Sequence, residues 1–111
     1  MSTVSGKIII PSKAPKVSAT RAAVRVRDVT YSDSAELVAE RVTVVDVAPG
    51  VPIDFSIDVP DDRLSDRVTL NLEVHIDLDG SGYFSPGDLV SMHPHRILPT
   101  THQVDVPVSL V

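Results

Sequence analysis

The sequence predicts an all-β protein, folded as a single antiparallel β-sandwich of about seven strands. Valine and other β-branched residues recur in short runs that are separated by clusters of proline, glycine, aspartate and serine. Two of these runs alternate regularly between apolar and polar residues, as strands with one buried face do. A chain of 111 residues is long enough for one hydrophobic core, so we expect one domain over residues 1–111.

The N-terminal part of the chain is expected to form two strands. The first, Val4–Ile10, ends at Pro11, which has no amide hydrogen to continue a ladder. The second covers about Thr20–Val29 and has one apolar and one partly charged face, as a half-buried strand requires. On these faces, Ala22, Val24 and Val26 alternate with Ala23, Arg25 and Arg27.

The next segment, Glu36–Val47, fits two interpretations. Its first residues read like the start of a helix that Ser32 or Asp33 would cap. After Arg41, however, the β-branched content is high and the valines partly alternate, which favours a strand. We therefore predict a strand that ends at the Pro-Gly turn following it.

Two segments in the middle of the chain carry the strongest strand pattern. Val51–Val59 places valine, isoleucine and phenylalanine on one face, and Pro60 ends it. The acidic connection 61–66 has the composition of a helical turn, and Val68–Ile76 then alternates again. The last two strands are predicted at Leu89–Ile97 and Gln103–Val111, the latter with Val104, Val106, Val108 and Leu110 on one face.

The segment 77–88 resembles a twelve-residue calcium loop of the EF-hand type. In that scheme, oxygen ligands come from positions one, three, five, seven, nine and twelve, with glycine at position six. Gly82 falls at position six. The ligands would be Asp77, Asp79, the Ser81 hydroxyl, the main-chain carbonyl of Tyr83, Ser85 directly or through water, and Asp88.

Two departures from the scheme predict weak calcium binding. Ser81 stands where Asp or Asn is usual, and Asp88 is one methylene shorter than the usual bidentate Glu. We expect a dissociation constant of roughly 10⁻⁵ to 10⁻³ M. The alternative is a plain hairpin loop, because Asp-Gly, Ser-Gly and Pro-Gly pairs are common in turns that bind no metal.

Composition excludes several classes of protein. Fifteen acidic and ten basic residues give a net charge of −5, so we expect no nucleic-acid partner. The sequence has no cysteine, which excludes disulfides, thiolate metal sites and a lipidated cysteine within these residues. The opening residues have neither the basic start nor the long apolar run of a signal peptide, and we expect no membrane span.

Histidines provide a second metal hypothesis. His93 and His95 are two residues apart, and His75 and His102 flank them in the sequence, so a zinc, copper or nickel site is an alternative to calcium. No Gly-x-Ser-x-Gly elbow surrounds any serine, and the adjacent carboxylates of Asp61 and Asp62 are typical of a solvated connection. We therefore expect no enzymatic activity.

Three parts of the sequence have a pattern shared with known proteins: Val24–Thr30, Val51–Ile57 with Arg63–Val68, and Val74–Gly80 continuing through Gly87–Leu89. On these stretches the sequence resembles the YbaY/YscW-type family of small bacterial β-sandwich proteins from Gly6 to Leu98. This resemblance implies an immunoglobulin-like sandwich without catalysis; some members are envelope lipoproteins, and one branch acts as chaperones (pilotins) for type III secretion secretins. The envelope members differ by a signal segment and a lipidated cysteine.

Taken together, these patterns predict a non-enzymatic binding or structural module in which calcium stabilises the hairpin loop 77–88. A chaperone-like module that binds a partner peptide at a sheet edge is the first alternative. The histidine-based metal protein is the second.

Overall fold

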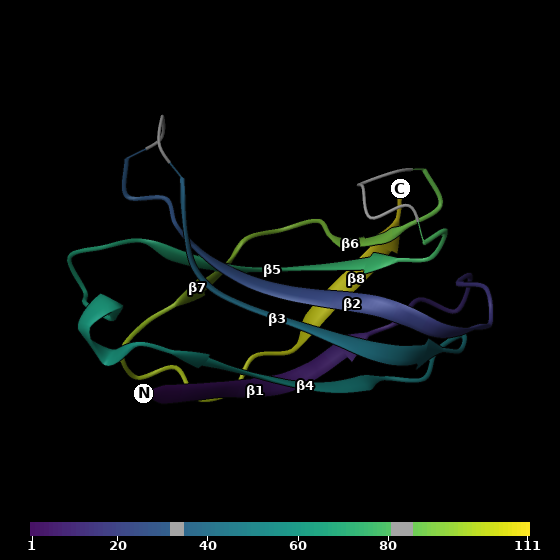
Figure 1. Cartoon of the computed structure of the whole chain (residues 1–111), viewed down its shortest axis with the longest axis horizontal. Coiled ribbons are helices and arrows are strands. Elements are labelled where there is room, and N and C mark those ends of the chain that lie inside the picture. The colour runs from purple at the N-terminus through teal and green to yellow at the C-terminus, as the bar shows by residue number, and fades with distance from the viewer. Residues whose placement is uncertain (32–34, 81–85) are drawn as a thin grey trace.

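The protein, seen here as a computed structural model, consists of strands of 3 to 12 residues linked by turns and loops. The structure describes residues 1–31, 35–80 and 86–111. The all-β prediction is confirmed, since one turn of 3₁₀ helix is the only helical element in the described part of the chain (Figure 1). The elements are β1 (Ser2–Ile9), β2 (Val17–Asp28), β3 (Glu36–Val47), β4 (Ile53–Val59), η1 (Asp61–Arg63), β5 (Leu70–Asp77), β6 (Leu89–Ser91), β7 (His95–Ile97) and β8 (Val106–Leu110).

Each predicted strand segment contains a strand. Glu36–Val47 is extended throughout, so the helical alternative for this segment is wrong. The predicted strand 89–97 is interrupted, because Pro94 lacks the amide hydrogen that a ladder needs. Its two pieces, β6 and β7, both pair with β5.

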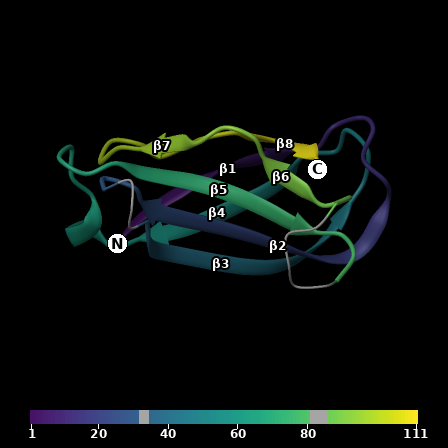
Figure 2. The ribbon, with the colours of Figure 1, turned by 90° about the horizontal axis from the view of Figure 1, so that it is seen from above.

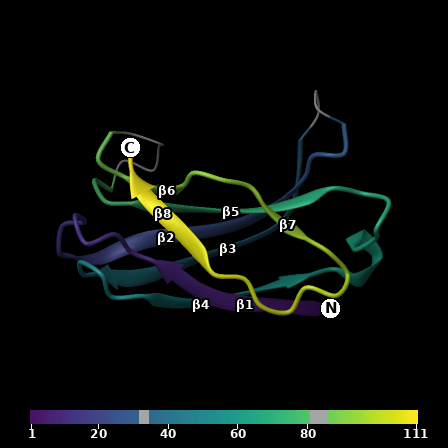
Figure 3. The ribbon, with the colours of Figure 1, turned by 180° about the vertical axis from the view of Figure 1, so that it is seen from behind.

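The strands form one mixed sheet in the order β3-β2-β5-β6-β8-β1-β4, with β7 beside β5 off this path. The short strand β6 pairs with both β5 and β8, and β8 in turn runs parallel to β1, so the pairing passes without a break from one side of the molecule to the other (Figure 3). The expected antiparallel, immunoglobulin-like sandwich of two sheets is therefore corrected to a curled, barrel-like sheet. The right-handed twist of the strands brings its two ends toward each other.

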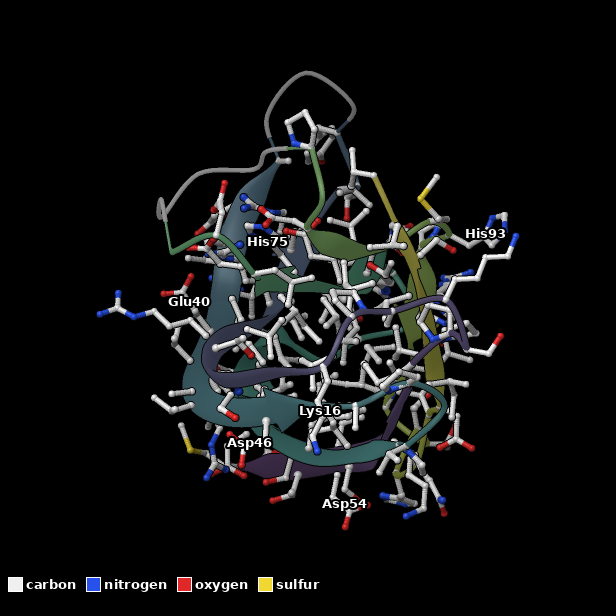
Figure 4. The ribbon with its side chains drawn as sticks, turned by 90° about the vertical axis from the view of Figure 1, so that its right-hand side faces the viewer. Lys16, Glu40, Asp46, Asp54, His75 and His93 are labelled. Carbon is white, nitrogen blue, oxygen red and sulfur yellow. The ribbon has the colours of Figure 1, made fainter. Side chains whose placement is uncertain are left out.

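The core lies inside this curl. Seen along the long axis, the strands surround a packed interior, with polar side chains such as Glu40, Asp54 and His93 on the outside (Figure 4). The inward positions of β2, β4 and β5 are mostly apolar, which is the alternation that the sequence predicts. Fully buried side chains include Val4, Ile8, Val26, Ile57, Val59, Leu70, Leu72, Ile76, Leu89, Ile97 and Val106.

The barrel-like sheet remains open along one seam. Its two end strands, β3 and β4, follow each other in the chain, run in opposite directions and lie next to each other without forming a ladder (Figures 1 and 2). Within the described parts of the chain, each end strand pairs with one neighbour, β3 with β2 and β4 with β1. Each therefore has a row of main-chain amide and carbonyl groups on its other side.

Candidate functional site

The acidic loop lies at the junction of β5 and β6. Asp77 is the last residue of β5, and Asp88 directly precedes β6. Because Ile76 is the ladder partner of Leu89, the two strands bring Asp77 and Asp88 opposite each other. The register of the β5–β6 ladder therefore brings the two ends of this loop together.

Three of the predicted calcium ligands come together there. Asp77, Asp79 and Asp88 each offer a carboxylate oxygen, and these oxygens lie within 4.8 Å of one another. Asp77 and Asp88 are buried, whereas Asp79 is exposed. The other predicted ligands, Ser81, Tyr83 and Ser85, lie outside the described residues, as does Gly82. Calcium binding by this loop stays a prediction.

Protein groups already hold the Asp88 carboxylate. Its Oδ1 accepts a hydrogen bond from the main-chain amide of Leu78 at 3.0 Å, and its Oδ2 lies 2.8 Å from Nε2 of His75. The Asp77 carboxylate accepts a bond from the amide of Gly80 at 3.0 Å, which shapes the start of the loop. These contacts stabilise the closed loop ends without an ion, so an ion would have to share Asp88 with His75.

His75 contacts the acidic loop, which the sequence pattern does not indicate. The sequence groups it with the other histidines, and the structure pairs it with Asp88 across β5 and β6. Within the described residues, the three aspartates form the only group of three or more acidic, histidine or cysteine side chains with metal-binding geometry, so the histidine-metal hypothesis has no geometric support. His75 and His93 lie apart in Figure 4. Burial lowers the pKa of His95, and the neighbouring His93 lowers it further.

The open seam is the second candidate site, and it contains a groove of about 230 Å³. Residues of β3 and β4 form its walls, and Val24 of β2 contributes an aliphatic surface. Val24 is buried, and Phe55 is half-buried. The groove is thus apolar at its base and polar at its rim. The lining residues are Val24, Arg41, Thr43, Asp54, Phe55 and Ser56.

One side chain crosses the seam. Arg41 is the ladder partner of Val24, so both side chains lie on the same, inward face of the sheet. Because β3 is an end strand, Arg41 lies at the edge of that face. Its Nη1 donates to the Oγ of Ser56 at 2.8 Å and to the Ser56 carbonyl oxygen at 3.4 Å. The Ser56 carbonyl therefore points away from β1 and into the seam.

The direction of the main-chain groups shows which side of β3 has no partner strand. Thr20 donates from its hydroxyl to the carbonyl oxygen of Val45 at 2.9 Å, so the Val45 carbonyl faces β2. Since main-chain groups of successive residues in a strand point to opposite sides, those of Val42 and Val44 face away from β2. The side chains of these two valines are 49% and 70% exposed. An aliphatic, unpaired edge of this kind is suited to pairing with another strand.

The fold and the two candidate sites define a small, barrel-like β-protein with an open seam between its end strands. The sequence matches a family described as "Type III secretion system lipoprotein chaperone (YscW)" over residues 1–110, and the chain belongs to this family. The resemblance seen in the sequence is thus confirmed. The family is one of secretion chaperones and not of enzymes.

A solved structure has the same fold. It is described as an alternative pilotin from the type II secretion system of Vibrio cholerae, and it superposes with a TM-score of 0.81 at 14% sequence identity. The match covers 99% of this chain and 96% of the other. No protein with a curated description matches the chain. Among the described residues, no helix has the length and apolar character needed to cross a membrane.

Proposed function

We propose that this protein is a pilotin-like chaperone that binds an extended segment of a secretin-class subunit along the open seam. Membership of a secretion-chaperone family supports a protein partner. The fold shared with a pilotin supports the same kind of role. The observation that carries the proposal is the pair of end strands, β3 and β4, which lie side by side around a groove and do not pair. The proposed role is binding without catalysis.

Strand addition is the binding mode that these edges favour. A peptide lying beside β3 would form main-chain hydrogen bonds with the groups of Val42 and Val44 that face away from β2. Its side chains would alternate between the groove, over Val24 and Phe55, and the exposed face of the two valines. Such a strand would satisfy edge groups and bury apolar surface at the same time, which is how a chaperone protects an aggregation-prone segment.

A titration of the ¹⁵N-labelled protein with overlapping synthetic peptides from the secretin-class subunits of the same organism tests this proposal. At least one peptide is expected to give saturable amide shifts at Val42, Val44 and Ser56. Val42→Pro removes an amide on the free side of β3 and should abolish binding, whereas Val42→Ala keeps that amide and should retain most of it. Saturable binding whose shifts lie only outside β3 and β4 would contradict the proposal.

Calcium binding at the loop is a second proposal, supported by the convergence of Asp77, Asp79 and Asp88 within 4.8 Å. We propose that the ion would stabilise this end of the barrel rather than switch it, because β5 and β6 already fix the loop ends. Calcium added to EDTA-treated protein should raise Tm, and magnesium should do so less. Asp79→Asn should weaken the effect without altering the His75–Asp88 contact. An unchanged Tm at several millimolar calcium would eliminate this site.

A further inference from the structure

The groove contains a cation whose bonded partners are neutral. Arg41 donates to the hydroxyl and the carbonyl oxygen of Ser56, and none of the ion pairs among the described residues includes it. A guanidinium binds a carboxylate more strongly than a neutral oxygen, because the hydrogen bonds are charge-assisted and two can form in parallel. Arg41 is therefore able to exchange Ser56 for an anionic partner.

Neighbouring charges do not neutralise this guanidinium. Arg25 and Arg27, on the opposite face of β2, form ion pairs with Glu40 and Glu73. Among the described residues that line the groove, Asp54 is the one carboxylate; the ammonium group of Lys7 bonds it at 2.8 Å, and it is largely exposed. The groove thus combines an apolar base with a guanidinium that forms no ion pair among the described residues, while the Asp54 carboxylate at its rim is paired with Lys7.

We propose that Arg41 recognises a side-chain carboxylate of the bound peptide, so that the seam selects an extended aliphatic segment containing an aspartate or glutamate. This inference rests on the proposed function, since it needs a peptide strand in the seam. The acidic side chain would project toward the inward face, where Arg41 is, and its two neighbours in the peptide would lie on the outer face beside Val42 and Val44. Insertion of the strand would remove water from the groove and strengthen the ion pair.

The net charge of −5 opposes an acidic ligand at long range. At physiological ionic strength, charges further apart than about 8 Å are largely screened, whereas a contact inside the groove is screened much less. Local recognition by Arg41 therefore outweighs the overall field. A partner that bound through the net charge would instead be basic and would lose affinity steeply with added salt.

The experiment compares two capped peptides that alternate valine with threonine and carry either one central aspartate or one central asparagine. Both end groups are blocked, so the aspartate is the only carboxylate. Titration into the ¹⁵N-labelled protein should give shifts at Val42 and Ser56 with both peptides, and about tenfold or greater affinity for the aspartate peptide. Arg41→Gln should remove this preference, Arg41→Lys should keep part of it, and the matched charge deletion Arg96→Gln on β7 should leave it intact.

The possible failures are distinct. Equal affinity of the two peptides for the seam would overturn carboxylate recognition while leaving strand addition in place. A preference that persists in Arg41→Gln would assign the carboxylate to another cation and would also overturn the inference. Absence of shifts at Val42 and Ser56 with both peptides would overturn strand addition, and the inference with it. Amide spectra of each variant check that the fold is retained.

Discussion

Arg41 of β3 and Ser56 of β4 join the two ends of the sheet through one guanidinium, with Nη1 2.8 Å from the serine hydroxyl. A side-chain bridge of this kind replaces the main-chain ladder that would close a complete barrel. It leaves the amides on the free side of β3 available and forms one wall of the groove. A peptide strand that entered the seam would have to displace this bridge.

Proline substitutions test which side of β3 is free. Thr43 lies in the regular stretch of the β2–β3 ladder, and its main-chain groups face β2, as those of Val45 do. Thr43→Pro should therefore reduce the free energy of unfolding by about 2 kcal/mol more than Val42→Pro, because only the former breaks a bond to β2. Urea denaturation of both variants measures the difference. A larger loss in Val42→Pro than in Thr43→Pro would mean that the strand is oriented the other way.

The Asp88 carboxylate is expected to stabilise the fold whether or not calcium binds. Asp88→Ala would leave the amide of Leu78 and the ring nitrogen of His75 without this acceptor in a buried position, at a cost of about 3 kcal/mol. Asp79 provides the comparison, and Asp79→Ala should cost less stability than Asp88→Ala, because Asp79 is exposed and Asp88 is buried. Denaturation in EDTA compares the two. A small effect of Asp88→Ala there would show that its contacts contribute little without metal.

Gly6 is required by a close contact between β1 and the segment before β8. A Cβ added to Gly6 would lie 1.8 Å from the carbonyl oxygen of Val104, whose amide donates to Ser5 at 3.0 Å. Gly6→Ala should destabilise the protein by roughly 3 kcal/mol. To make room for the Cβ, either the segment at Val104 has to move away from β1, or β1 has to shift in its ladder with β4. Gly50 has φ of 70° but open space around it, so Gly50→Ala should cost only about 1 kcal/mol. Thermal denaturation of the two variants tests this order.

The lowered pKa of the Asp28 carboxyl predicts that the protein loses stability in acid. The hydroxyl of Thr30 (2.6 Å) and its amide (3.0 Å) lower the pKa of the Asp28 carboxyl, and Arg63 lowers it further. Because the pKa is lower in the folded state than in the unfolded one, this stabilisation is complete above the unfolded value of about 4 and is lost as the pH falls through the folded value. Asp28→Asn should therefore flatten the dependence of Tm on pH below about pH 4. An unchanged slope would assign the acid sensitivity to other carboxylates.

Much of the local structure follows from sequence pattern. The period-two alternation in 51–59 and 68–76 reflects the geometry of a strand with one buried face, and both segments contain strands. The break in 89–97 could have been predicted from Pro94, which has no amide hydrogen to donate. The strand end beside Asp77 was also indicated by the sequence, because Gly80 follows within three residues and glycine marks a turn.

The sequence alone determined that this protein is all-β, that its strands alternate inward and outward, and that it resembles secretion chaperones. These properties depend on local geometry and on sequence similarity. Tertiary structure alone decided that β6 and β8 join the strands into one curled sheet, that His75 contacts Asp88, and that Arg41 meets Ser56 across an open seam. Which strands pair depends on the packing of the whole core. A period-two pattern indicates which face of a strand is buried, but it does not indicate which strand lies beside it.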